Sequence, residues 1–209
     1  MNRIHRRAGI GLIAYAVCTA AAFFGSGAPG GDYSASSVAN YIASANLPLI
    51  ATLWGIAAVG ALGLLVVADG LRTQPRSGPL LAGLATAGAA VSVAGAFVSG
   101  GVAIAMAEGG AAVREGVPPA VVYTITEIGN LLAVCAPALC VGVAAIVMAV
   151  RSALPGWLRV ISVPAGICGI LAPLFVTYFV FLLWALLAGT AIAVRRTAAL
   201  ALDAAPSMV

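Results

Sequence analysis

The stretch Val160–Val194, VISVPAGICGILAPLFVTYFVFLLWALLAGTAIAV, contains no Asp, Glu, Lys, Arg or His. As one helix it would be roughly 50 Å long at about 1.5 Å per residue, whereas the hydrocarbon core of a bilayer is about 30 Å thick. A single span would also place Arg159 and the Arg195-Arg196 pair on opposite sides, against the preference of basic residues for the cytoplasm. We therefore expect two spans, joined by a hairpin near Leu171-Ala172-Pro173.

The rest of the chain has the same apolar character. Hydrophobic residues make up 63% of the sequence, charged residues 8%, and the mean hydropathy is +1.13. A soluble domain has about 25% charged residues. Further long apolar runs are separated by short segments rich in Gly, Pro and Arg. The sequence predicts a single all-α domain, a polytopic transmembrane helix bundle with six spans at about 8–24, 47–68, 80–106, 119–150, 156–171 and 173–194.

The arginines predict the orientation of the bundle. All of the 10 basic residues are arginine, and with six spans only Arg114 falls on the outer side. We therefore expect both termini in the cytoplasm and the protein in the plasma (inner) membrane of a bacterium. Because the arginines lie between apolar runs, the net charge of +4 does not indicate nucleic-acid binding. The first apolar run could equally be a signal peptide, and we expect it to be kept as an anchor helix.

The C-terminal third carries a resemblance to a known group of proteins. It contains Leu154-Pro155-Gly156-Trp157-Leu158, a short glycine-containing helix, and a closing helix with Leu183-Trp184 before Arg195-Arg196. These features resemble small six-helix actinobacterial membrane proteins that are catalogued only as a domain of unknown function. The resemblance implies a fold and no activity.

One carboxylate lies inside a predicted span. Glu127 follows Tyr123 by four residues and precedes Asn130 by three, so these side chains share a helix face, with Thr126 beside them. Pro137 removes the helical donor of the Ala133 carbonyl, which favours a kink or a local cavity. Ionisable groups inside a membrane are costly and tend to be functional. We therefore take Glu127 as the candidate catalytic residue, and the substrate-binding candidates are Tyr123, Asn130 and Thr126.

Two interpretations of Glu127 remain open from the sequence. The run from Ile128 to Val150 is long enough to cross a bilayer by itself, so Glu127 could lie hydrated at the outer interface. Alternatively it lies in a polar pocket in the outer half of the membrane. The segment at about 34–46 is amphipathic, with Val38, Tyr41 and Ile42 on one face. It could cap such a pocket or only cover helix ends.

Small residues predict one packed face in the third span. Gly88, Ser92, Gly95 and Ser99 recur at spacings of three and four, which brings helices into close approach. We expect this stripe to pack inside the protein, with a homo-oligomer contact as the alternative. The four cysteines form no Cys-x-x-Cys motif, and His5 is the only histidine, so no metal site and no cofactor is expected.

Three functions are compatible with these features. The first is a membrane protein that binds a lipophilic small molecule or another membrane protein. The second is a membrane-embedded isomerase or cyclase that acts on a lipophilic substrate, with Glu127 as general acid. The third is a small transporter, which would ordinarily show inverted repeats or several polar groups at mid-membrane depth.

Overall fold

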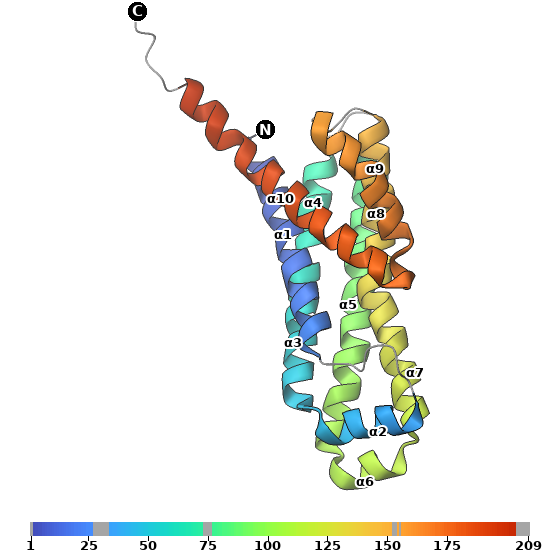
Figure 1. Cartoon of the computed structure of the whole chain (residues 1–209). Coiled ribbons are helices and arrows are strands. Elements are labelled where there is room, and N and C mark those ends of the chain that lie inside the picture. The colour runs from blue at the N-terminus through green and yellow to red at the C-terminus, as the bar shows by residue number, and fades with distance from the viewer. Residues whose placement is uncertain (1, 27–33, 73–76, 152–153, 155, 204–209) are drawn as a thin grey trace, which may run out of the picture.

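The computed structural model describes residues 2–26, 34–72, 77–151, 154 and 156–203, and all regular structure in this part of the chain is helical (Figure 1). The elements are α1 (Asn2–Gly25), α2 (Ala35–Ser44), α3 (Leu47–Ala61), α4 (Gly63–Arg72), α5 (Gly78–Glu108), α6 (Gly110–Gly116), α7 (Pro119–Asn130), the π-helical turn η1 (Leu131–Cys135), α8 (Ala136–Val150), α9 (Gly156–Ile170), the 3₁₀ turn η2 (Ala172–Leu174) and α10 (Val176–Asp203).

Five helical segments are long and apolar enough to cross a membrane: Arg6–Gly25, Leu47–Arg72, Gly78–Glu108, Pro119–Val150 and Val176–Val194. They coincide with five of the six predicted spans, so the all-α membrane bundle is confirmed. The remaining predicted span corresponds to α9, which is apolar but shorter. Its end, Ile170, falls where the hairpin was predicted, and η2 forms the turn into α10.

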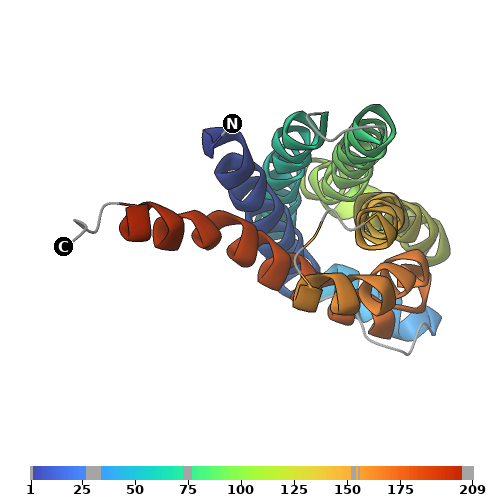
Figure 2. The ribbon, with the colours of Figure 1, turned by 90° about the horizontal axis from the view of Figure 1, so that it is seen from above.

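Most of the helices run along the bundle, and two short helices lie across one of its ends (Figure 1). At one end α2 and α6 lie crosswise, and we call this the α2/α6 end. The opposite end holds Arg72, Arg151 and Arg159, and we call it the arginine end. The turn between α9 and α10 stops part way along the bundle, and α10 then leads obliquely back past α1 and away from the other helices (Figures 1 and 2).

Pairs of glycines lie at four of the helix crossings. At each pair, a methyl group on at least one of the two residues would collide with the backbone of the other. Lipid offers no hydrophobic force between helices, so close backbone contact of this kind is what drives their packing. The pairs are Gly9–Gly189 between α1 and α10, Gly11–Gly63 between α1 and α4, Gly95–Gly129 between α5 and α7, and Gly142–Gly166 between α8 and α9.

The small-residue stripe of α5 packs inside the protein, as predicted. Gly88 lies against the backbone of Pro137, and Gly95 lies against α7 and η1. Ser92 and Ser99 are buried and donate hydrogen bonds to the same neighbouring segment. The homo-oligomer contact is therefore not needed to explain this stripe.

Pro137 interrupts the Pro119–Val150 segment in the way that its chemistry demands. The amide of Ala136 donates to the carbonyl of Leu131, five residues earlier, which makes the π-helical turn η1. The Ala133 carbonyl, which has no donor on residue 137, accepts a hydrogen bond of 2.7 Å from Ser92 Oγ. The predicted irregularity at Pro137 is confirmed, and a serine of α5 satisfies the exposed carbonyl.

The predicted amphipathic segment forms α2. Ser34 caps the helix by accepting from the Ser37 amide, and Val38 and Ile42 are buried against the bundle. The Tyr41 hydroxyl donates to the Ser26 carbonyl at 2.8 Å and ties α2 to the end of α1. The segment between the third and fourth predicted spans contains a short helix, α6.

Candidate functional site

The four candidate side chains lie on α7, near the α2/α6 end of the bundle. The helix starts at Pro119, which suits a first turn because its missing N–H would have no helical acceptor. Asn130 is buried, whereas Tyr123, Thr126 and Glu127 are half-buried. The predicted shared face exists, and its deepest member is the amide of Asn130.

Hydrogen bonds connect Asn130 to both α5 and Glu127. Ser99 Oγ donates to Asn130 Oδ1 at 3.1 Å and also lies 3.3 Å from the Thr126 carbonyl oxygen. Asn130 Nδ2 lies 3.4 Å from Glu127 Oε2 and donates to it. We call Ser99, Asn130 and Glu127 the polar chain. Its bonds orient the Asn130 amide, because the oxygen must face the serine and the nitrogen must face the carboxylate.

The polar chain leaves the Glu127 carboxylate with spare acceptor capacity. A carboxylate offers about four lone-pair sites, and Asn130 uses one of them. Thr126 contributes its backbone carbonyl to Ser99. Tyr123 packs against the main hydrophobic core, which fixes the turn that precedes Glu127. The arrangement can therefore accept a hydrogen bond or a positive charge, or exchange a proton, at one fixed carboxylate.

Exposed apolar side chains neighbour Glu127 along the helix. Ile128 is 50% exposed and Leu131, one turn further along the helix, is 36% exposed. Val122, on the inward side, is buried in the same core cluster as Val38 and Ile42 of α2. The carboxylate thus lies at the boundary between the packed core and the lipid-facing surface of α7.

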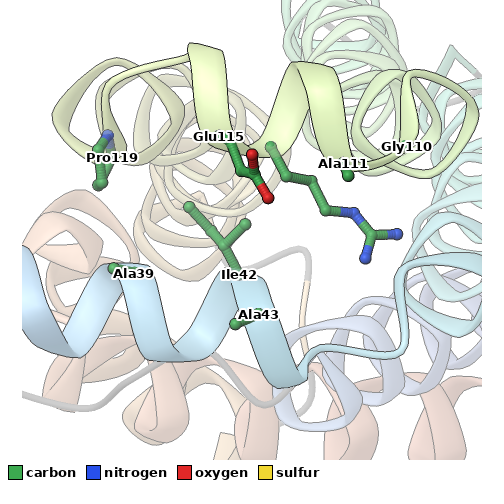
Figure 3. Close-up of a pocket in the computed structure, with 8 residues that line it drawn as sticks. Ala39, Ile42, Ala43, Gly110, Ala111, Glu115 and Pro119 are labelled. Carbon is green, nitrogen blue, oxygen red and sulfur yellow. The ribbon is translucent and has the colours of Figure 1, made fainter.

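A separate groove of about 400 Å³ lies between α2 and the α6–α7 segment (Figure 3). Ile42 of α2 faces Glu115 across it, and Pro119 lies at one side (Figure 3). The lining of this groove does not include Tyr123, Glu127 or Asn130. The amphipathic helix α2 therefore covers a hollow at the α2/α6 end, but the candidate residues are not the ones that line it.

Three polar side chains that the sequence did not distinguish are placed by the structure. Ser99 belongs to the small-residue packing stripe of α5, and only its position opposite Asn130 shows that it also bonds to the candidate site. Tyr15 and Tyr178 are completely buried where α1 packs against α10. Hydroxyls of three threonines bond to backbone carbonyls, at Thr19, Thr52 and Thr177.

The cysteines add no further chemistry to this region. All four are free thiols, and Cys135, the last residue of η1, is buried. Within the residues that the structure describes, no three His, Cys, Asp or Glu side chains gather in a way that could hold a metal ion.

Comparison with known protein families, curated proteins and solved structures found no match for this chain. The resemblance of the C-terminal third to six-helix actinobacterial proteins therefore stays a prediction.

Proposed function

We propose that this protein binds an amphipathic lipophilic molecule from the outer leaflet of the membrane, with Glu127 accepting a hydrogen bond from the polar headgroup. The observation that carries the proposal is the polar chain: a half-buried carboxylate that Asn130 and Ser99 hold in one orientation. A fixed acceptor beside an apolar surface suits a ligand with one donor group and a hydrocarbon tail.

The proposal includes an orientation with both termini in the cytoplasm and six membrane segments. It rests on the arginine end, where α1 begins, α4 and α8 end and α9 begins (Figure 1). The α9–α10 hairpin enters from that end and returns to it, so Arg159 and the C-terminal end of α10 stay on one side. In the proposed orientation α2 and α6 lie outside, in line with the distribution of positive charge.

In this orientation Glu127 lies at the outer boundary of the hydrocarbon. It is roughly 36 Å from Arg151 along α7–η1–α8 at about 1.5 Å per residue, compared with a core of about 30 Å. A headgroup at this depth remains near water, and the tail can follow Ile128 and Leu131 towards the middle of the bilayer. The ligand therefore enters sideways from the lipid rather than through the groove under α2.

The test compares ligands that share a tail and differ in the headgroup. Lauryl amine, lauryl alcohol and methyl laurate are each added to the purified protein in detergent, and the unfolding temperature is measured. We expect stabilisation in the order amine, alcohol, ester, because only the first two donate and the amine also carries charge. A free ligand concentration of about a hundred times the dissociation constant would raise the free energy of unfolding by about 2.7 kcal/mol.

The variant Glu127→Gln keeps the shape of the side chain and removes the charge. We expect it to lose the preference for the amine, whereas Glu108→Gln, the same change at the exposed end of α5, keeps it. Equal shifts for amine and ester, or an unchanged preference in Glu127→Gln, would contradict the proposed site.

The orientation has its own test. Ala111→Cys in α6 and Trp157→Cys in α9 place exposed thiols at opposite ends, in a background where the four native cysteines are alanine. An impermeant thiol reagent added to intact cells should label position 111 and not position 157. The reverse pattern would invert the topology and place Glu127 on the cytoplasmic side.

A further inference from the structure

The groove between α2 and the α6–α7 segment carries two opposite charges. Its lining includes Arg114 and Glu115, which are neighbours on α6, and the apolar side chain of Ile42 (Figure 3). The turn at Gly110, with a positive φ of 59°, leads from α5 into α6, which lies crosswise near α2 (Figure 1). On the other side, the Tyr41 hydroxyl ties α2 to the end of α1. Both walls of the groove are therefore anchored to the bundle.

One hydrogen bond orients the guanidinium of Arg114. Its Nε donates to the carbonyl of Met106, in the last turn of α5, at 3.1 Å. This bond uses one donor of the guanidinium and leaves the two terminal nitrogens for other acceptors. Those nitrogens form an edge that can bind a carboxylate through two parallel hydrogen bonds. Arg114 thus offers an oriented anion-binding edge to the groove.

Glu115 adds a carboxylate to the same groove. It faces Ile42 across the groove (Figure 3). Among the described residues Glu115 makes no hydrogen bond or ion pair, and Arg114 bonds to a backbone carbonyl instead. Adjacent side chains on a helix do not face each other, which keeps these two charges apart. A positive and a negative group therefore line the groove without neutralising each other.

The two charges select against ions of either sign. An anion that Arg114 attracts is repelled by Glu115, and for a cation the signs are reversed. A molecule that carries both charges gains a charge-assisted hydrogen bond at each residue. The wall that α2 contributes is apolar, with Ile42 and the small, exposed Ala39 and Ala43. The groove therefore suits a zwitterion with an apolar side group.

The position of the groove favours a water-soluble molecule over a lipid. Pro119, which lines the groove, begins a helical segment of 32 residues that ends at Val150. This segment is roughly 48 Å long at about 1.5 Å per residue, whereas a bilayer with its headgroups is about 40–45 Å thick. Val150, at the arginine end, is apolar and 67% exposed, as expected for a residue against lipid. The surplus length therefore lies at the α2/α6 end, where the groove opens to water.

We propose that this groove binds a small water-soluble zwitterion of the amino-acid class, a free amino acid or a dipeptide. Its carboxylate pairs with Arg114 and its ammonium with Glu115, and its apolar side group lies against Ile42. The groove volume of about 400 Å³ is within the range of small-molecule sites, about 300–1,000 Å³. This site is separate from Glu127 and does not depend on the binding of a lipophilic molecule there.

The first measurement is equilibrium dialysis of the purified protein, in an uncharged detergent, with leucine and with leucyl-leucine, which differ in the spacing of their charges. The N-acetyl derivative of each keeps only the negative charge, and the methyl ester keeps only the positive one. We expect at least one zwitterion to bind, and both of its capped forms to bind about tenfold more weakly, because each lacks one charge-assisted contact. If neither zwitterion binds at millimolar concentrations, or if the capped forms bind equally well, the proposal is wrong.

The second measurement repeats the dialysis with variants of the groove. Glu115→Gln should weaken binding of the zwitterion about tenfold and strengthen binding of the N-acetyl form, because it removes the charge that repels an anion. Ala43→Phe should abolish binding by filling the groove. The control Glu108→Gln, the same change at the exposed end of α5 and outside the groove lining, should bind like the wild type. Binding that Glu115→Gln and Ala43→Phe leave unchanged would place the zwitterion elsewhere and overturn the site.

Discussion

A single methyl group at Gly95 should destabilise the protein, because this glycine lies where α5 meets α7 and η1. A Cβ at residue 95 would lie 2.6 Å from the Gly129 carbonyl oxygen and 2.7 Å from the Leu132 carbonyl carbon. These are backbone atoms, so no rotamer change relieves the contact, and the two segments must separate. Overpacking of this kind costs about 1–3 kcal/mol.

The separation would also strain two hydrogen bonds on the same face. Ser92 Oγ to the Ala133 carbonyl and Ser99 Oγ to Asn130 Oδ1 span the same interface at 2.7 and 3.1 Å, and each contributes about 0.5–1.5 kcal/mol. Alanine in place of a helical glycine stabilises the helix by up to about 1 kcal/mol, because its helix propensity is higher. We therefore expect Gly95→Ala to lower the free energy of unfolding by about 2 kcal/mol.

Gly101→Ala provides the matched control on the same helix. A Cβ at residue 101 meets no atom within 4 Å, so the substitution carries only the gain in helix propensity. Both variants would be unfolded with SDS in mixed micelles and followed by circular dichroism. If Gly95→Ala and Gly101→Ala unfold at the same SDS concentration, the reasoning that α5 closely approaches η1 at residue 95 is refuted.

Three further outcomes follow from single contacts. Ser92→Ala should cost about 1–3 kcal/mol, because it leaves the buried Ala133 carbonyl without a donor; the exposed Ser36→Ala should cost less than 0.5 kcal/mol in the same SDS titration. Ser162→Ala removes the acceptor of the buried Trp184 indole N–H at 2.9 Å, so the tryptophan emission should shift and stability should fall by about 1–3 kcal/mol; unchanged emission would contradict this contact. Burial raises the pKa of Tyr41 above 10.0, so docked α2 keeps its stability below pH 10 and loses it as the pH rises through the raised pKa. The amplitude of the late-titrating tyrosinate absorbance should be smaller in Tyr41→Phe than in the wild type, and an unchanged amplitude would refute the assignment.

Much of the fold follows from the sequence because bilayer thickness acts on chain length directly. An uncharged run that is too long for one span must fold back, and the turn at Ala172–Leu174 lies where Pro173 and the arginine positions predict it. Pro137 likewise predicts a carbonyl without a donor, since that consequence follows from the missing N–H alone. The residue that satisfies the carbonyl, Ser92, is 41 positions away in the chain, and local rules cannot identify it.

In the candidate site, too, the sequence predicts some features and the tertiary structure decides the others. The helical period places Tyr123, Glu127 and Asn130 on one face. That period does not tell which of them is buried, nor that Ser99 would orient the Asn130 amide, since both depend on how α5 lies against α7. The burial of Tyr15 and Tyr178 could not be predicted from the sequence for the same reason, because it depends on how α1 packs against α10.

The sequence by itself therefore determined that this protein is built for a membrane environment and that it is helical. It also determined the approximate ends of the membrane segments and the position of the one carboxylate within a predicted span. These properties depend on composition, period and length, which are local quantities. The tertiary structure decided which glycines pair, which carbonyls the serines reach and which tyrosines are buried. Those properties depend on contacts between residues far apart in the chain, and they are set by the close packing of helices against each other.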